Sequence, residues 1–232
     1  MELKGIEEGL RRLRDMKNKI IPTVFAHNAK DFNKRFSKLI KIANYIQIDF
    51  MDGKFVSGKS IELNKIPNLK KYKNNFEAHL MVKNPQNWVK RCLVKGFDKI
   101  IFHIEAVRNA KEAIKIIDYV KNKGKKCFVA INPSTPLERI IPLIIGSDID
   151  GILIMGVYPG KEHQNLVGNV FARIRQIKKL NKKIVVQIDG GVNDKTALRI
   201  SRAGEDLINT GSFVSEAKNP KKALMLLEKK FK

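Results

Sequence analysis

Four polar residues in this sequence have the types and spacing needed for acid/base or metal chemistry. Gln47 and Asp49 lie in YIQIDFMDGKFV (residues 45–56), where apolar and polar residues alternate as in a β-strand until a turn begins at Asp-Gly. Residues two apart on a strand face the same side, so Gln47 and Asp49 are expected together near its carboxyl end. His79 in FEAHLMV and Asp189 in VVQIDGG also stand in predicted strands. Two carboxylates, an imidazole and an amide suit a divalent cation that takes oxygen and nitrogen ligands.

Each of these side chains also has a structural interpretation. A buried carboxylate such as Asp49 must be paired, and the amides of the following turn would satisfy it without any catalytic role. A single inward histidine such as His79 is commonly a hydrogen-bonded core residue. Asp52 is expected to be a plain turn residue. The catalytic interpretation of His79 gains weight because several metal-capable groups are expected at the same place.

The segments around these residues predict alternating strands and helices. Strands are predicted at 19–25, 44–50, 76–82, 98–104, 126–131, 151–156, 183–188 and 206–210. Helices are predicted at 31–43, 61–72, 85–95, 107–123, 135–145, 166–180, 193–203 and 215–230. Eight strand–helix units predict an α/β fold of parallel strands, a (β/α)8 TIM barrel. An open doubly wound sheet is the alternative, but its Gly-rich first turn is missing.

The barrel is predicted to form one domain over residues 1–232. Residues 1–17 are expected to be an N-terminal extension that contains an amphipathic helix over 3–16, with its apolar residues on one stripe. In such a barrel the side chains at the carboxyl ends of the strands converge at one mouth. The four polar residues are therefore predicted to meet there.

Small residues after the last two predicted strands indicate a phosphate subsite. Gly190 and Gly191 follow the seventh strand, and Gly211 and Ser212 follow the eighth. Backbone amides can approach a phosphate closely at such loops, and these are the loops that bind phosphate in many (β/α)8 barrels.

The composition excludes some classes of protein and favours others. The net charge of +23 is spread over nearly every segment, so a specific nucleic-acid partner is not expected, whereas a field of this sign would attract an anionic substrate. No apolar run approaches the roughly 18 residues needed to cross a bilayer, so no membrane partner is expected. Cys92 and Cys127 have no metal-type spacing and fit a reduced, cytoplasmic compartment.

The motifs at the strand ends resemble the ribulose-phosphate 3-epimerase family, from about Ile21 to about Ala223. The matching segments, in chain order, are Pro22-Thr23, IDFMDGKFV, HLMVKNPQNW, FHIEA, GKKCFVAINPSTPLE, MGVYPG, IDGGVN and TGSFV. The resemblance implies that Asp49 and Asp189 are the two acid/base residues. It also implies a divalent metal (zinc, iron or manganese) bound by these aspartates, by His79 and by the residue at position 47.

The sequence departs from the family pattern at the metal site and at the phosphate loop. Gln47 stands where the family has a histidine, so the fourth candidate ligand is a weaker amide oxygen. Thr23 replaces a serine and keeps its hydroxyl. The family loop N-P-G-F-G-G-Q reads Y-P-G-K-E-H-Q at 158–164, which loses two glycines and keeps Gly160. Ser57-Gly58-Lys59 replaces P-N-x.

The resemblance implies an isomerase of the pentose phosphate pathway, a homo-oligomer that interconverts D-ribulose 5-phosphate and D-xylulose 5-phosphate by two-base proton transfer through a metal-stabilised enediolate. The implied substrate contacts are Thr23, His79, Gly160, Gly190, Gly191, Gly211 and Ser212. Two alternatives stay open: an epimerase of another ketose phosphate, such as allulose 6-phosphate, and a barrel that binds a sugar phosphate without catalysis.

Overall fold

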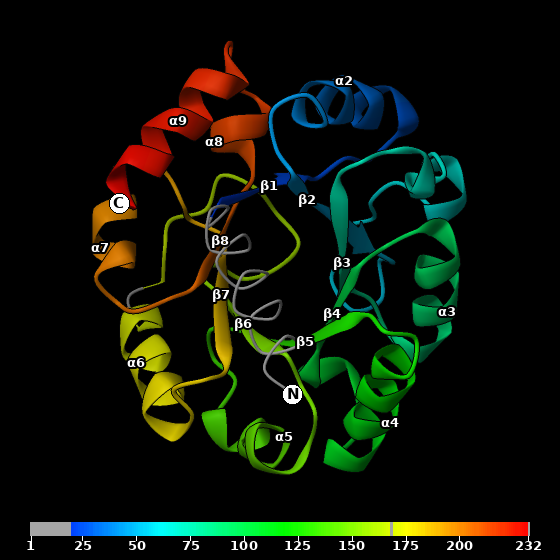
Figure 1. Ribbon diagram of the computed structural model, residues 1–232, viewed down its shortest axis with the longest axis vertical. Coiled ribbons are helices and arrows are strands. Elements are labelled where there is room, and N and C mark those ends of the chain that lie inside the picture. Colours follow the sequence, from blue (N-terminus) through cyan, green and yellow to red (C-terminus); the bar gives the residue numbers. More distant parts are fainter. Residues whose placement is uncertain (1–19, 168, 232) are drawn as a thin grey trace, which may run out of the picture.

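In the computed structural model, which describes residues 20–167 and 169–231, eight parallel strands close into a barrel (Figure 1). The strands follow one another in chain order, and β8 pairs with β1 to complete the ring. Helices surround the barrel on its outside (Figure 1). The predicted (β/α)8 architecture is confirmed, whereas the predicted N-terminal helix over 3–16 lies outside the described residues.

The strands form from short, largely apolar segments. They are β1 (Ile20–Val24), β2 (Tyr45–Met51), β3 (Asn75–Met81), β4 (Lys99–His103), β5 (Lys126–Ile131), β6 (Gly151–Met155), β7 (Val185–Asp189) and β8 (Leu207–Thr210). Every observed end lies within two residues of its predicted position. Nearly all strand residues are buried, because helices cover the outer face while side chains fill the interior.

The helices follow the strands around the barrel. They are α2 (Ala29–Leu39), α3 (Gln86–Lys95), α4 (Ala110–Lys121), α5 (Ile141–Gly146), α6 (Val170–Leu180), α7 (Ala197–Ser201), α8 (Ser212–Ser215) and α9 (Pro220–Lys230), with 3-10 turns η3 (Ile104–Ala106) and η4 (Leu137–Arg139). Asn28, Asn109 and Asn219 cap α2, α4 and α9, each accepting a hydrogen bond from a backbone N–H three residues on. Pro220 begins α9, so this helix starts five residues later than the helix predicted over 215–230.

The connection after β2 differs from the prediction, because residues 61–72 form no α-helix. Two 3-10 turns, η1 (Leu63–Lys65) and η2 (Leu69–Lys71), stand there instead. Pro67 separates them, since a proline lacks the N–H that a helix needs and disfavours the helical conformation in the residue before it. Ile66 is accordingly extended, with a ψ of 154°.

The interior of the barrel is divided into an apolar part and a polar part. The apolar part is contributed by β4, β5, β6 and the loop after β6, and its buried residues are Ile101, Phe128, Ala130, Leu153, Met155 and Val157. The polar part is contributed by β2, β3, β4, β7 and β8, and its buried residues below the mouth are Gln47, Glu77, Lys99, Gln187 and Asn209. A buried polar layer of this size is stable only if its members bond to one another.

Gly151 on β6 is expected to be essential for the packing of the apolar part. A Cβ at this position would lie 2.5 Å from the ring of Phe128 and 2.6 Å from the carbonyl oxygen of Val185. Gly151→Ala is therefore expected to lower the free energy of unfolding by about 1–3 kcal/mol, measured by urea denaturation. Gly146→Ala is the matched control, because no atom lies within 4 Å of its added Cβ. Equal stability of the two variants would contradict the packing argument.

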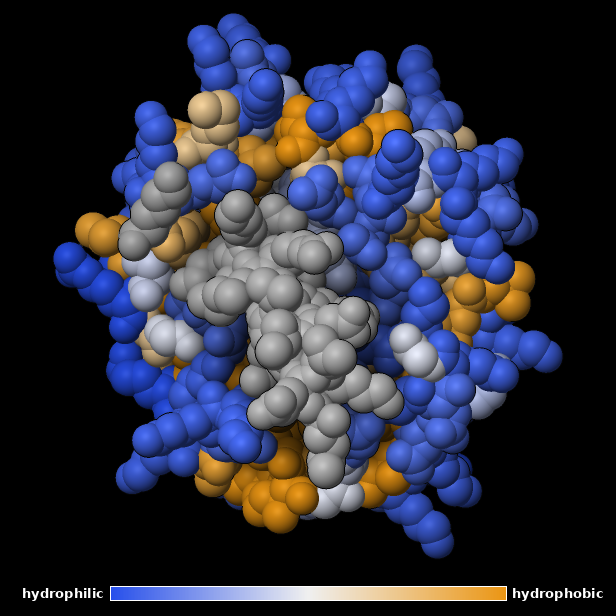
Figure 2. All heavy atoms as spheres, in the orientation of Figure 1, coloured by the Kyte–Doolittle hydropathy of each residue, from blue (hydrophilic) through white to orange (hydrophobic). Residues whose placement is uncertain are grey.

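Charged side chains project from the outside of the barrel. Hydrophilic residues cover much of the periphery in the view of Figure 2, with apolar patches between them. Most of the described lysines are exposed or half-buried, as expected for a net charge carried on outer helix faces. Among the described residues, no helix has the length and apolar character required to span a membrane.

Candidate active site

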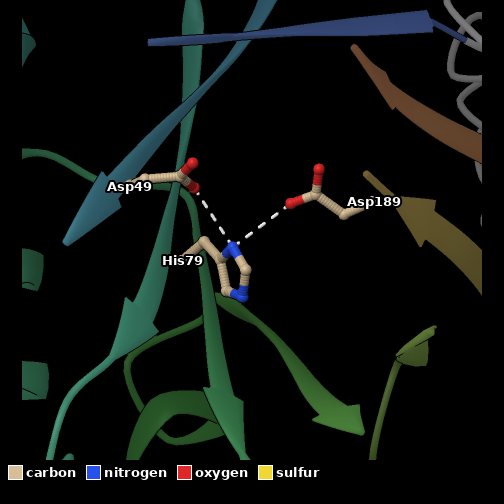
Figure 3. Close-up of side chains that lie close together, drawn as sticks. All are labelled: Asp49, His79 and Asp189. Atoms are coloured by element: carbon tan, nitrogen blue, oxygen red, sulfur yellow. Dashed lines mark hydrogen bonds and ion pairs between the residues drawn. The ribbon is translucent and has the colours of Figure 1, made fainter. Parts of the chain in front are cut away.

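Asp49, His79 and Asp189 meet at the carboxyl-end mouth of the barrel, as the sequence predicted (Figure 3). Asp49 lies near the end of β2 and is paired in register with His79 of β3, while Asp189 is the last residue of β7. Successive residues of a strand face opposite sides, so these polar side chains face the interior while their apolar neighbours pack under the helices. Both carboxylates point toward the same ring nitrogen of the histidine (Figure 3).

The three side chains are almost fully buried and are joined by hydrogen bonds. Nδ1 of His79 lies 3.1 Å from Oδ1 of Asp49 and 3.2 Å from Oδ2 of Asp189. Burial raises the pKa of Asp49 to about 6, although the hydrogen bond from His79 opposes this rise. Burial by itself would lower the pKa of His79, but the bonds to Asp189 and Asp49 outweigh it and raise this pKa to about 10. These two neighbouring carboxylates therefore favour the protonated form of His79.

A chain of further side chains orients His79. Nε2 of His79 lies 2.9 Å from Nε2 of His103, and Nδ1 of His103 lies 3.3 Å from Oε2 of Glu105. Burial lowers the pKa of His103, so its Nε2 accepts the hydrogen bond of His79 while its Nδ1–H donates to Glu105. Glu105 also accepts from the N–H of Asn132 and from the hydroxyl of Thr135. The sequence did not identify Glu105 and Thr135 as part of the site, since they lie beyond the ends of β4 and β5.

Gln47 turns its amide nitrogen, and not its oxygen, toward the two aspartates. Nε2 of Gln47 lies 3.0 Å from Oδ1 of Asp49 and 2.6 Å from Oδ2 of Asp189, the same two oxygens that face His79. Its Oε1 accepts a hydrogen bond from Nδ2 of Asn209 at 2.9 Å. The structure therefore places a hydrogen-bond donor where the sequence predicted a weak metal ligand.

Three of the four predicted ligands fit a divalent cation. One ligand atom from each of Asp49, His79 and Asp189 lies within 4.8 Å of the other two. Two carboxylate oxygens and an imidazole nitrogen suit several divalent metals, and His79 would lose its Nδ1 proton on binding. The bond from its other nitrogen to His103 is the kind of support that metal-binding histidines have. Gln47 does not fit as a fourth ligand in this orientation, because its N–H groups face the oxygens that a cation would bind.

A cavity of about 420 Å³ opens over these residues, and glycines form part of its wall. Gly190 and Gly191 have positive φ angles of 93° and 72°. A Cβ on Gly190 would lie 2.4 Å from the side chain of Val157, and one on Gly191 would lie 2.9 Å from the backbone of Leu166. Both positions therefore require glycine, and the bare backbone can come close to an anion. The lining also includes the other predicted contacts: Thr23, Gly160, Gly211 and Ser212.

A carboxylate that the sequence did not assign to the site lies against the same wall. Oε1 of Glu162 is 3.5 Å from the place that a Cβ on Gly211 would take. Both oxygens of Glu162 accept hydrogen bonds from Nη1 of Arg35, on α2, at 3.1 Å, and Arg35 also pairs with Asp31 and Glu216. Burial raises the pKa of Glu162, whereas Arg35 opposes the rise. The predicted phosphate subsite thus contains a negative charge held by a guanidinium group.

Two loop positions near the mouth have structural roles. Asp52 is a turn residue, as predicted, because its carboxylate accepts hydrogen bonds from the backbone N–H groups of Lys54, Phe55 and Lys83. His163 has a φ of 60°, in the left-handed region that favours glycine. The loop pattern that residues 158–164 resemble has a glycine at position 163, a residue that adopts this conformation without a steric cost.

The fold and the site together define a (β/α)8-barrel enzyme with paired carboxylates at the carboxyl ends of its strands. Comparison with protein-family models narrows this class. The model of the ribulose-phosphate 3-epimerase family matches residues 19–215, which is most of the chain. The chain belongs to the ribulose-phosphate 3-epimerase family.

Relatives in several organisms agree with this assignment. The ribulose-phosphate 3-epimerase of Chlamydia muridarum is 31% identical over 195 residues, which cover 80% of this chain and 83% of that protein. The protein of Mycobacterium bovis with the same name is 30% identical over 192 residues, which cover 81% of this chain and 82% of the other. The ribulose-phosphate 3-epimerase, cytoplasmic isoform, of Oryza sativa subsp. japonica is 28% identical, and the match covers 91% of this chain and 93% of the rice protein.

Solved structures support the fold. The 3-hexulose-6-phosphate synthase of Salmonella typhimurium superposes with a TM-score of 0.71 at 14% identity, covering 92% of this chain and 98% of that chain. KGPDC of Streptococcus mutans superposes with a TM-score of 0.67 at 13% identity, covering 92% of this chain and 96% of that chain. At such low identity these likenesses concern the barrel alone.

Proposed function

We propose that this protein is a ribulose-phosphate 3-epimerase that interconverts D-ribulose 5-phosphate and D-xylulose 5-phosphate. The observation that carries the proposal is the pair of buried carboxylates, Asp49 and Asp189, which approach one nitrogen of His79 from different sides (Figure 3). Epimerisation beside a ketone needs two proton carriers, one for each face of the substrate. Membership of the family and the names of the relatives support the same activity.

In the proposed reaction, Asp49 and Asp189 exchange protons with C3 of the ketose phosphate from opposite faces. One carboxylate removes the C3 proton, the electron pair of the C–H bond forms a C2–C3 double bond, and the C2 oxygen takes the negative charge. The other carboxyl group then gives its proton to C3 from the opposite face, and the C2 carbonyl re-forms. A pKa of about 6 suits Asp49 to both tasks near neutral pH. Nδ1 of His79 lies within 3.2 Å of an oxygen of each carboxylate, so the histidine helps to hold both in place.

The proposal includes a divalent cation of zinc, iron or manganese as cofactor. Asp49, His79 and Asp189 would hold it, and their three converging ligand atoms support this part of the proposal. When bound, such an ion supplies a Lewis acid for the ketone oxygen. Metal analysis of the purified protein identifies the ion.

The phosphate group of the substrate is proposed to rest on the glycine wall of the cavity. Gly190, Gly191, Gly211 and Ser212 would offer backbone amides, and Thr23 and Gly160 would complete the wall. The net charge of +23 would raise the rate at which an anionic substrate arrives.

The proposed activity is tested by C3 proton exchange of ribulose 5-phosphate in heavy water, followed by NMR, together with the appearance of xylulose 5-phosphate. We expect both to occur, to fall after treatment with a chelator and to return when metal is added back. Turnover of allulose 6-phosphate in preference to ribulose 5-phosphate would replace the proposed substrate. Binding of both sugars without exchange would show a barrel that binds sugar phosphates without catalysis.

Glu162→Gln is expected to lower the KM for ribulose 5-phosphate. The substitution removes a negative charge from the proposed phosphate subsite and keeps an oxygen that can accept from Arg35. The change in KM should be about threefold to tenfold at low salt, with kcat unchanged, because an electrostatic contact near the surface is worth roughly 1 kcal/mol or more. Steady-state kinetics measures it. Glu62→Gln is the control, since Glu62 is exposed and its ion pair with Lys65 lies at the surface. An unchanged or higher KM in Glu162→Gln would contradict this placement of the phosphate.

The proposal also covers the cellular compartment, the metabolic pathway and the oligomeric state of the enzyme. We place it in the cytoplasm and in the pentose phosphate pathway, in keeping with the name of the rice relative and with the proposed substrate. We further propose a homo-oligomer without nucleic-acid or membrane partners. Light scattering of the purified chain tests the oligomeric state.

A further inference from the structure

Five buried side chains form a closed hydrogen-bond network beneath the two aspartates. They come from five strands and are Gln47 (β2), Glu77 (β3), Lys99 (β4), Gln187 (β7) and Asn209 (β8). Each has an exposed fraction of 2% or less. The network reaches the active site through Gln47, whose amide bonds to Asp49 and Asp189.

Lys99 fixes the orientation of every amide in this network, because an ammonium group can only donate. Its Nζ lies 2.6 Å from Oε2 of Glu77 and 3.1 Å from Oε1 of Gln187. Gln187 must therefore turn its Nε2 to the other side, where it donates to Oε1 of Glu77 at 2.7 Å and to Oδ1 of Asn209. The amide of Asn209 is thus fixed with its oxygen toward Gln187.

The same order of donors and acceptors continues from Asn209 to Gln47 in the active site. Nδ2 of Asn209 donates to Oε1 of Glu77 at 2.8 Å and to Oε1 of Gln47 at 2.9 Å. Gln47 therefore accepts on this side and presents Nε2 to Asp49 and Asp189. If Gln47 turned over, its Nε2 would face the Nδ2 of Asn209, and its oxygen would face two carboxylates. Both contacts would be repulsive in a buried site.

We propose that the network anchored at Lys99 holds Gln47 as a hydrogen-bond donor to the two aspartates, so that Gln47 is a positioning residue and a divalent cation has only three protein ligands here. Those ligands are Asp49, His79 and Asp189. The inference deepens the proposed function and rests on it for the roles of the aspartates. Its main test measures metal binding without substrate, so it can fail while the proposed activity stands, and the reverse is also possible.

The main test is the affinity of the chelator-treated full chain for Zn²⁺, measured by calorimetry against a competing chelator. Gln47→Leu should bind Zn²⁺ at least as tightly as the unmodified chain, because it removes N–H groups that face the cation and removes no ligand. A loss of about tenfold or more in Gln47→Leu would show that Gln47 is a ligand and would overturn the proposal.

Asn209→Leu tests whether the network is what fixes Gln47. Without Nδ2 of Asn209, the oxygen of Gln47 loses its partner and is free to turn toward the cation, so the affinity for Zn²⁺ should rise by about tenfold. The double variant Gln47→Leu/Asn209→Leu should lose that gain, because the gain depends on the oxygen of Gln47. A gain in affinity that persists in the double variant, or no gain in Asn209→Leu, would contradict the proposal that the network holds Gln47 in this orientation.

Two further measurements keep the inference testable if Asn209→Leu fails to fold. Gln47→Leu should lower kcat for ribulose 5-phosphate and leave its KM nearly unchanged, since Gln47 does not line the cavity that holds the phosphate. In the unmodified chain, the side-chain NH2 of Gln47, assigned by through-bond NMR, should exchange slowly with water. A rise in KM with unchanged kcat, or NH2 exchange at the rate of an exposed amide, would overturn the proposal.

Discussion

Asp189→Asn is expected to lower the rate of ribulose 5-phosphate epimerisation at least about a thousandfold, because the variant lacks one of the two proton carriers. An asparagine has nearly the same shape and can still accept the hydrogen bonds that reach Asp189 from His79 and Gln47. The fold should therefore be preserved, with an unchanged circular dichroism spectrum. The measurement is kcat by a coupled assay for xylulose 5-phosphate.

Asp189→Asn should still catalyse proton exchange on one face of the substrate. Asp49 is still present, so it can remove the C3 proton that faces it and return a deuteron to the same face in heavy water. Asp189→Asn should therefore exchange the C3 proton of one epimer without inverting it. Asp49→Asn should do the same for the other epimer, because the two carboxylates serve opposite faces of the substrate.

This pattern separates a two-base reaction from other roles of the aspartates. Asp194→Asn is the matched control, since Asp194 lies in the loop after β7 and does not line the cavity, and it should keep full activity. Substantial epimerisation by Asp189→Asn, or exchange of the same epimer by both variants, would contradict the assignment of one aspartate to each face.

Lys99→Met is expected to destabilise the protein by about 3–5 kcal/mol, because it leaves the carboxylate of Glu77 buried without its cation. Lys99 and Glu77 are 2% and 0% exposed as side chains, and their charged atoms are 2.6 Å apart. The ammonium group also lies 4.3 Å from the ring centre of Phe128, at the border of the apolar part of the interior. Such a loss is a large part of the stability of most domains, so the midpoint of urea denaturation should fall strongly.

The cause of this loss can be tested with a second change at the partner. Glu77→Gln/Lys99→Met removes both charges of this pair, so it should be more stable than Lys99→Met alone. Lys65→Met is the control for loss of a lysine, because the pair of Lys65 with Glu62 is exposed and should contribute less than about 1 kcal/mol. If the double variant is less stable than Lys99→Met, the unpaired charge is not the cause.

The sequence alone determined the architecture and the central residues of the site. Strand positions follow from local patterns of apolar residues, and eight strand–helix units have few ways to close other than a barrel. The barrel then brings the carboxyl ends of its strands together, so Asp49, His79 and Asp189 had to converge although they lie far apart in the chain. The prediction of a helix over 61–72 was wrong, because Pro67 interrupts this segment and separate 3-10 turns form on its two sides.

Only the tertiary structure decided what surrounds these residues. Arg35 and Glu162 are separated by 127 positions, and no local pattern indicates that they pair beside Gly211. The orientation of Gln47 depends on a chain of donors and acceptors that begins at Lys99 and links four strands. A sequence shows that an amide is present, whereas the direction in which it donates is set by its neighbours in space. For this reason the sequence predicted a weak metal ligand at position 47, and the structure places a hydrogen-bond donor there.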